Sequence, residues 1–270
     1  MIDDARGLSP RIRLIVSTGV MSILAIAAEP RFALYGIADD FTLFSATFGY
    51  LTPFITVVAV IGIVNAINMS DGRNSIVTGM TVIWCLALIC KTDNSLSVVI
   101  LLSIVTNSAL LLFQNLKNNI FLGDSVSYSI GAAFSGIAIY WYSGQFSGSY
   151  LNSLEMFCLF SIPVLDMVRV VILRMSVGLS PFAADHNHLH HRLYARFGWK
   201  LGLPIYLGLV LIPIIVEFQT FKVAELLGVV AAGASYVYAI RITRPPDDLV
   251  SEKKTAETGN ELLTQLPYEN

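Results

Sequence analysis

The histidines of this chain are confined to one short polar segment. All four lie between positions 186 and 191, where the sequence reads HNHLHH, and an arginine follows directly. Imidazole and guanidinium groups donate hydrogen bonds to phosphate oxygens, so the segment favours a phosphate or other anion site. Two alternatives stay open: a solvated polar loop, and a structural zinc site, although zinc usually draws on cysteine or on ligands from two elements. The candidate ligands are Asn187, His188, His190, His191 and Arg192.

A second polar segment joins two apolar stretches. Asn65, Asn68 and Asp71 follow one another at intervals of three, so in a helix their side chains share one face. The plain interpretation is a turn marked by the pair Asp71-Gly72. Oxygen-bearing side chains at the end of a membrane helix are costly unless they bind something, which favours a ligand or metal site.

Two further carboxylate segments complete the set. Asp3 and Asp4 form an adjacent pair near the start of the chain, and Asp124 follows a glycine before an apolar stretch. Alone, the pair is typical of a solvated terminus and Asp124 of a helix cap. Carboxylates beside asparagine amides suit Mg²⁺, which keeps several waters and bridges substrate phosphates. Beside an anion-binding histidine segment, they indicate phosphoryl transfer from a cytosolic nucleotide compound to an acceptor held in the membrane.

Membrane helices must position these residues. Of 270 residues 55% are hydrophobic and 13% charged, a composition that excludes an ordinary soluble protein. A bilayer core needs about 20 mostly apolar residues per helix. The sixth apolar run contains Pro163, Asp166 and Arg169, so we expect its second half to enter water or to line a polar cavity. The runs predict an all-α polytopic membrane helical bundle with about eight transmembrane helices, at 12–28, 47–67, 75–90, 96–114, 128–143, 154–173, 201–217 and 222–240.

Basic residues divide unevenly between the two sides that eight spans define. Of 17 Lys and Arg residues, all but Arg31, Lys91 and Lys222 fall on the side that receives the N-terminus and the four polar segments. The positive-inside rule makes that side cytoplasmic. We therefore expect residues 1–244 to form a membrane domain with its polar loops in the cytoplasm, and residues 245–270 to form a disordered cytoplasmic tail. The net charge of −2 predicts no nucleic-acid partner.

Four segments resemble the signatures of the polyprenyl-phosphate N-acetylhexosamine-1-phosphate transferases, glycosyltransferase family 4. Residues 3–14 are similar to its aspartate-pair segment, and residues 65–72 to its Asn-x-x-Asn-x-x-Asp-Gly segment. Residues 121–124 match Phe-x-Gly-Asp. The family's long cytoplasmic loop with its His-x-His-His signature resembles residues 165–169, 178–182 and 185–193. The residues of this loop are more similar to the GlcNAc-type branch of the family than to the muramyl-pentapeptide branch.

The resemblance implies a reaction in the bacterial inner membrane. Undecaprenyl phosphate attacks the β-phosphorus of a UDP-N-acetylhexosamine, releasing UMP and leaving the sugar on a lipid diphosphate, which initiates cell-envelope polysaccharide or O-antigen synthesis. Asp3 would deprotonate or position the lipid phosphate, and the histidines would grip substrate phosphates. In this scheme the catalytic residues are Asp3, Asp4 and Asp71, the Mg²⁺ ligands are Asp124 and Asp71, and the substrate-binding residues are Asn65, Asn68, Asn187, His188, His190, His191 and Arg192.

Four positions depart from the family pattern. Ser75 stands where a glycine commonly follows the Asp-Gly turn, and Val126 replaces a glycine after the Gly-Asp pair. Gly7 stands where a third acid is often found, and Asn119 where a lysine is frequent. These departures bear on sugar choice and loop geometry more than on reaction class.

Two other classes of protein fit part of the pattern. A transporter also places polar residues along membrane helices, although here they gather at one interface rather than across the midplane. An inactive fragment of the transferase is the second alternative. The family carries about three membrane helices before its aspartate pair, which begins at Asp3 here, so we expect the 270-residue chain expressed alone to be inactive or very weak. A homodimer through membrane helices is left open.

Overall fold

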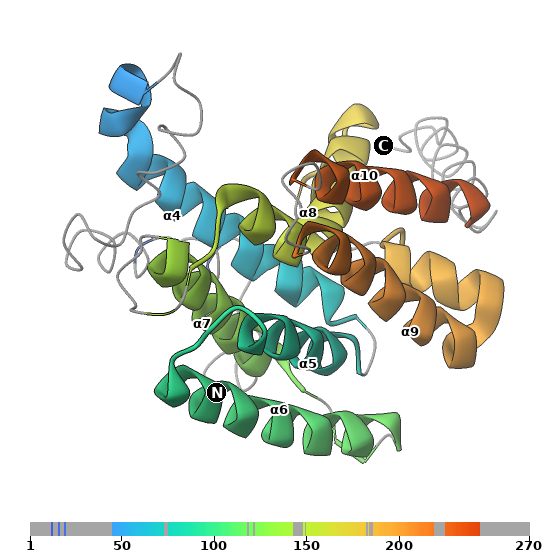
Figure 1. Cartoon of the computed structure of the whole chain (residues 1–270). Helices are drawn as coiled ribbons and strands as arrows, with labels where there is room; N and C mark the ends of the chain where they lie inside the picture. The colour runs from blue at the N-terminus through green and yellow to red at the C-terminus, as the bar shows by residue number, and fades with distance from the viewer. Residues whose placement is uncertain are drawn as a thin grey trace, which may run out of the picture.

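Seven helices make up the described part of the chain, and it contains no β-strand (Figure 1). The computed structural model describes residues 45–72, 75–117, 119–120, 122–142, 148, 150–181, 183, 186–218 and 225–243, with Ile12, Val16 and Gly19. The predicted all-α class is confirmed within these residues. Asp3, Asp4, nearly all of the first expected span and the expected tail lie outside them. The helices are α4 Ser45–Ser70, α5 Ile76–Ile89, α6 Ser95–Leu116, α7 Asp124–Tyr142, α8 Ser153–Ser176, α9 Leu189–Glu217 and α10 Glu225–Ile242.

The expected count of eight membrane spans is not confirmed. Each of the last seven expected runs falls on one helix, but within the described residues only four helices are long and apolar enough to cross a membrane. Segments Ile76–Ile89 and Leu227–Ile242 are apolar but shorter, and α7 is not among the candidates because serines and glycines interrupt its apolar residues. The four are Pro53–Ser70, Ser95–Leu116, Ser153–Ser176 and Leu189–Glu217.

The two helices that carry acidic candidates pack closely together. Helix α4 lies against α7 and α8. A Cβ atom on Gly131 of α7 would come within 2.9 Å of the Val64 Cα atom of α4, so only glycine permits this approach. The close packing brings the end of α4 next to the start of α7, where Asn68 and Asp124 lie.

Helix α8 contains a proline whose missing N–H group is compensated from another helix. Pro163 cannot donate to the carbonyl of Leu159, four residues earlier. The indole Nε1 of Trp84 on α5 donates to that carbonyl at 2.8 Å instead. Because an unsatisfied buried carbonyl is costly, Trp84 makes the proline tolerable and joins α5 to α8.

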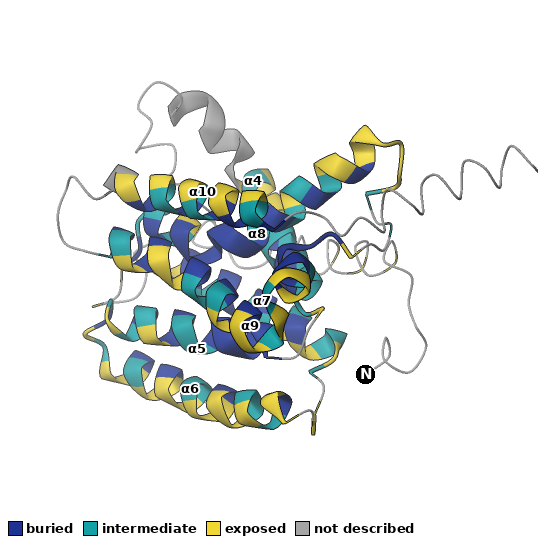
Figure 2. Cartoon of the chain, turned by 90° about the vertical axis from the view of Figure 1, so that its right-hand side faces the viewer, coloured by how far each residue is buried: buried dark blue, intermediate teal, exposed yellow. Residues whose placement is uncertain are grey.

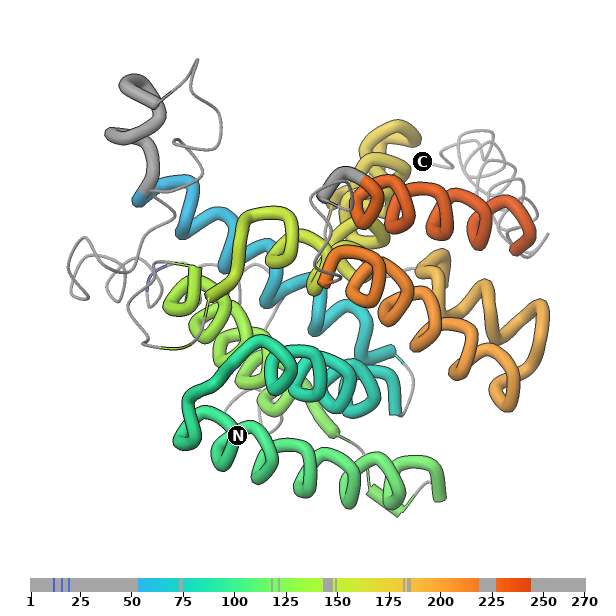
Figure 3. The backbone as a smooth tube through the Cα atoms, viewed as in Figure 1, coloured from blue at the N-terminus to red at the C-terminus, as the bar shows by residue number. Residues whose placement is uncertain are grey.

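Helix α9 turns sharply at Gly198, which has a φ of 68° that favours glycine. The segment before the turn and the longer segment after it lie side by side, as Figure 3 shows. A Cβ atom on Gly202 would come within 3.3 Å of the Leu193 backbone, so the two segments pack closely. The histidine segment therefore opens a short helix that folds back on the bundle.

Two expectations for this region are wrong. Residues 165–169, expected in a cytoplasmic loop, lie inside α8, which continues to Ser176. For the second half of this span we expected either entry into water or a polar cavity; Asp166 does not meet water, since it is only 3% exposed, and the polar cavity stays a prediction. The histidines from His190 onward are helical rather than part of a loop.

Helix α6 is the most peripheral element. It packs chiefly on α5 and presents an exposed apolar face on the outside of the bundle (Figure 2). Val99, Ile100 and Phe113 are each about half exposed on this face. An apolar surface of this kind suits lipid rather than water.

Candidate active site

Two of the predicted metal ligands meet where α4 ends and α7 begins. Asp71 follows α4 directly, and Asp124 is the first residue of α7. The side-chain amide of Asn68 donates to Asp124 Oδ1 at 3.1 Å and to Ser127 Oγ at 2.9 Å. Gly123, with a φ of 76°, provides the left-handed turn that starts α7 at this position. Asn68 thus orients the Asp124 carboxylate.

The Asp71 carboxyl is a perturbed acid. Its pKa is raised from 3.8 to about 7, chiefly by burial and further by the negative charge of Asp124, while a hydrogen bond from Ser127 opposes the rise. Two carboxylates that disfavour each other's charge in a half-buried site are stabilised by a cation or by a shared proton. Perturbed acids of this kind gather at functional sites.

The residues at this site fit Mg²⁺ better than zinc. Within the described ranges, no group of three or more His, Cys, Asp or Glu side chains is arranged to hold a metal ion. Zinc would need such a set, whereas Mg²⁺ uses one or two carboxylates and fills its remaining positions with water and substrate oxygens. Asp71 and Asp124 could supply those two carboxylates.

Two other polar residues of this region, Asn65 and Ser70, make hydrogen bonds within the protein. The Asn65 amide donates to the Ile61 carbonyl at 2.8 Å, so its nitrogen bonds to its own helix. Ser70, which precedes Asp71, accepts from the hydroxyl of the buried Tyr206 at 3.3 Å. Tyr206 lies on α9, and this contact joins α9 to the Asp71 turn.

The histidine segment reaches the same turn. The His190 ring lies against Gly72, the neighbour of Asp71. The rings of His190 and His191 are 4.1 Å apart, and those of His191 and the exposed His186 are 4.9 Å apart. The structure therefore brings together Asp71, Asp124 and His190, three residues that the sequence predicts at one site.

His188, like His190, is buried in the protein. Its Nδ1 atom lies 3.0 Å from Asp166 Oδ2, and its Nε2 atom lies 3.4 Å from Arg174 Nη2. Asp166 also bonds to Arg169 of α8 and to Tyr236 of α10. The side chain that we expect to grip phosphate is thus part of a buried network.

Asn187 and Arg192 also use their polar atoms within the protein. Arg192 donates to the carbonyls of Thr243, at 2.7 Å from Nε, and of Ile240, at 2.9 Å. These carbonyls are at the C-terminal end of α10, where intrahelical donors are missing. Arg192 Nη1 also lies 3.4 Å from Asn187 Oδ1. Both residues therefore fasten the histidine segment to α10.

The sequence did not reveal the roles of the buried partners of the site. Asp166 and Arg169 stood out as ionisable residues inside a membrane span, but they were given no role in the site, and Tyr236 was not predicted at all. Ser127 was also missed, and its spacing of three from Asp124 in the first turn of α7 was the available clue. Tyr206 carried no such signal, because its partner Ser70 is remote in sequence.

Comparisons with known proteins show the family to which the chain belongs. The family model described as glycosyl transferase family 4 matches residues 1–142. A Yersinia pestis protein named undecaprenyl-phosphate alpha-N-acetylglucosaminyl 1-phosphate transferase is 27% identical over 218 residues, covering 73% of this chain and 55% of its own length. The protein of the same name from Escherichia coli (strain K12) gives the same identity and coverage. The chain thus spans about half the length of these curated relatives. No solved structure gives a significant match.

Proposed function

Because the chain belongs to glycosyl transferase family 4, we propose that it catalyses sugar-1-phosphate transfer to a polyprenyl phosphate. The donor is a UDP-N-acetylhexosamine, in the first instance UDP-GlcNAc, and the acceptor is undecaprenyl phosphate. The lipid phosphate oxygen bonds to the β-phosphorus of the donor, the bond between that phosphorus and the bridging oxygen breaks, and UMP leaves. The names of the relatives support this choice of lipid and sugar.

One observation carries the proposal: Asp71, Asp124 and His190 come from three separate segments and converge at one turn. Asn68 links α4 to Asp124, and the His190 ring packs on Gly72. Phosphoryl transfer requires carboxylates that bind a divalent cation and, beside them, groups such as imidazoles that bind phosphate. Neither the helix packing nor a transporter pathway needs all three in one place.

We assign roles to the site residues on this basis. Asp71 and Asp124 hold Mg²⁺, which when bound neutralises negative charge on the diphosphate. His191, the more exposed of the two neighbouring imidazoles, donates hydrogen bonds to phosphate oxygens, and the buried His190 holds its ring against the Gly72 turn beside Asp71. Asp3 deprotonates or positions the lipid phosphate, and Asp4 lies beside it. Asn68 fixes the orientation of Asp124, and Asn65, Asn187 and Arg192 hold the surrounding backbone.

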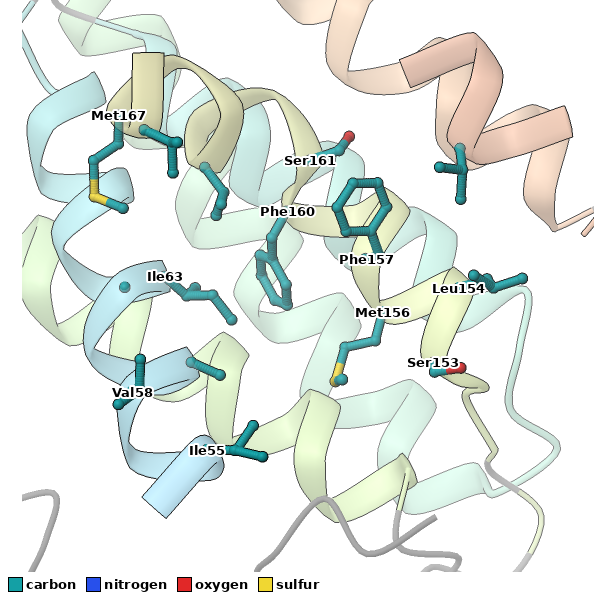
Figure 4. A pocket seen from close by; sticks show the side chains of 15 residues that line it. Ile55, Val58, Ile63, Ser153, Leu154, Met156, Phe157, Phe160, Ser161 and Met167 are labelled. Carbon is teal, nitrogen blue, oxygen red and sulfur yellow. The ribbon is translucent and has the colours of Figure 1, made fainter. Parts of the chain in front are cut away.

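An apolar groove between α4 and α8 is suited to the prenyl chain. Its volume is about 610 Å³, and Figure 4 shows Ile55, Val58 and Ile63 of α4 facing Phe157 and Phe160 of α8 across it. Of its 15 lining residues, only Ser153 and Ser161 are polar. The lining runs up α4 as far as Ile63, so Asp71 is about 12 Å further along at 1.5 Å per residue. A lipid in the groove would present its phosphate toward the acidic pair.

We place the site on the cytoplasmic face of a bacterial inner membrane, where UDP-sugars are available. The supporting observation is the excess of Lys and Arg on the side that carries the polar segments. The product then enters cell-envelope polysaccharide or O-antigen synthesis.

UMP release is the deciding measurement. The purified chain in detergent, and in parallel the product of the whole reading frame around it, would be incubated with UDP-GlcNAc, Mg²⁺ and undecaprenyl phosphate. We expect UMP release that needs all three. UDP-GalNAc and UDP-MurNAc-pentapeptide define the sugar preference. Lipid-independent release, or no release from either protein with any UDP-sugar, would contradict the proposal.

A further inference from the structure

Asp166 and His188 form a buried pair beneath the histidine segment, and this pair is outside the roles given above. We propose that Asp166 is a positioning residue, which fixes His188 in one tautomer so that His188 supports the ring of His190. His188 then acts through His190 and does not contact phosphate itself. This inference rests on the proposed function, because it assigns how one part of that site is held.

The Asp166 carboxylate accepts hydrogen bonds on both oxygens. Oδ1 accepts from Arg169 Nη2 at 2.8 Å and from the Tyr236 hydroxyl at 3.0 Å. Oδ2 lies 3.0 Å from His188 Nδ1 and accepts from the Leu189 backbone N–H at 3.0 Å. Groups from α8, α9 and α10 therefore converge on one residue that is 3% exposed. A buried charge is tolerated only when it is paired and hydrogen-bonded in this way.

The partners of His188 determine its tautomer. A carboxylate only accepts and a guanidinium only donates hydrogen bonds. His188 Nδ1, facing Asp166, must therefore carry the proton, and Nε2, facing Arg174 Nη2 at 3.4 Å, must accept. The imidazole is also 7% exposed, so both ring nitrogens are used inside the protein.

His190 depends on this orientation. The His188 and His190 rings are stacked, with centroids 5.7 Å apart and planes 6° apart. The Nε2 end of the His190 ring meets Gly72 beside Asp71. A rotation of His188 would therefore shift the imidazole that lies at the acidic pair.

An amide cannot replace the Asp166 carboxylate. All four neighbouring groups are donors, so an asparagine here would turn its NH₂ group toward either Arg169 and Tyr236 or His188 and Leu189. In the first orientation the asparagine NH₂ group faces the donors of Arg169 and Tyr236. In the second it faces His188 Nδ1, which favours the His188 tautomer that carries its proton on Nε2. Asp166→Asn thus tests the charge and the tautomer while almost conserving side-chain volume.

Substitutions of His188 separate support from phosphate contact. The asparagine amide reproduces the Nδ1–H donor, whereas the longer glutamine reproduces Nε2. Support through Asp166 predicts that His188→Asn keeps the most UMP release, with His188→Gln and His188→Ala lower by about 10- to 100-fold, the loss typical of removed supporting groups. Phosphate contact through Nε2 predicts the reverse order. Thr81→Ala, a buried change on α5 away from the groove and the acidic pair, is the control for general damage to the core.

A spectroscopic measurement tests the inference without any turnover. The chain has four histidines, so ¹⁵N-imidazole labelling gives a small set of ring signals. We expect one histidine to show an Nδ1–H tautomer with slow proton exchange, to be lost in His188→Asn and to change in Asp166→Asn. An Nε2–H tautomer for that ring overturns the inference even if UMP release is robust. If the Nδ1–H tautomer is observed but no form of the chain releases UMP, the proposed function is contradicted and the inference about Asp166 and His188 is not.

Discussion

The His190 ring lies directly against the bare α-carbon of Gly72. A Cβ atom at position 72 would come within 2.3 Å of His190 Nε2 and 2.9 Å of its Cε1 atom. The glycine of the Asp-Gly turn therefore admits an imidazole beside Asp71, and the turn and the histidine segment are parts of one structure.

Replacing Gly72 with alanine should displace His190. We expect UMP release to fall at least about tenfold, because a reacting group displaced by about an ångström loses much of its effect. The thermal midpoint should fall as well, since the added Cβ atom must displace the buried His190 ring. Gly208→Ala is the matched control, because a Cβ atom there meets nothing within 4 Å. Unchanged UMP release by the Gly72→Ala variant would show that the position of His190 does not affect the reaction.

Ser75→Gly should stabilise the protein. Ser75 has a φ of 80°, it is 2% exposed, and its hydroxyl finds no hydrogen-bond partner among the described residues. Left-handed backbone costs a non-glycine residue roughly 1–2 kcal/mol, so we expect a net gain of about 1 kcal/mol in the free energy of unfolding. Ser75→Ala removes the hydroxyl but keeps the strain, and should gain less. Denaturation in mixed micelles measures the free energy of unfolding of the unmodified protein and of the two variants. Equal gains in Ser75→Gly and Ser75→Ala would show that backbone strain at this position contributes nothing.

Mg²⁺ affinity should rise with pH through about 7. The pKa of Asp71 is raised to about 7 by burial and by Asp124, so below that pH the cation must displace a proton. Calorimetric titration with Mg²⁺ between pH 5.5 and 8.5 measures this, and Asp71→Asn should flatten the curve. A pH-independent affinity in the unmodified protein would exclude Asp71 as a ligand.

The same shift predicts an effect on stability in the absence of Mg²⁺. An acid whose pKa is higher in the folded than in the unfolded state loses stability as pH rises from about 4 to about 7. Asp71→Asn should therefore raise the thermal midpoint more at pH 8 than at pH 5, and Mg²⁺ should reduce the difference. An equal effect at both values would argue against burial of the charge.

Trp84 and Pro163 should be energetically coupled. Trp84→Phe leaves the Leu159 carbonyl without its indole donor, at a cost of about 1–3 kcal/mol for an unsatisfied buried group. In a Pro163→Ala background the new backbone N–H can bond to that carbonyl, so the same substitution should cost less by about 1 kcal/mol. Additive effects in the double-mutant cycle would show that the two helices do not share this hydrogen bond.

Cysteine labelling tests the sidedness that the basic residues predict. Cys85 and Cys158 are buried and Cys90 is exposed, so Cys90→Ser provides a suitable background. In this background, Ser125→Cys should react with an impermeant maleimide only from the cytoplasmic face. Tyr150→Cys, at an exposed position, should react only from outside. Labelling of both positions from one face would overturn the assigned topology.

The helices were more predictable from the sequence than their partners. Each apolar run from 47–67 onward marks a helix because burial in lipid and in the core both select the same residues. The start of α9 was misplaced, because its first turns carry histidines and arginines that read as a polar loop. Gly198, with a φ of 68°, then allows those turns to fold back on the rest of α9, and a hydropathy pattern does not predict such a change of direction.

The site was predictable where chemistry and spacing coincide. Asp71 and Asp124 stand out because carboxylates are rare beside membrane helices. Their separation depends on Gly131 meeting Val64, a contact between residues 67 positions apart that one sequence does not reveal. The position of Ser75 was informative, since the expected glycine coincides with an observed positive φ.

The clamp of Arg192 on the end of α10 imposes an order on biosynthesis. The carbonyls that it binds belong to Ile240 and Thr243, so this anchor forms only after those residues have been translated. The hydrogen bonds from the histidine segment to Asp166 of α8 can form earlier, because both partners precede α10 in the chain. The segment is therefore held first at its start, by α8, and is fastened at Arg192 only when the last described helix is in place.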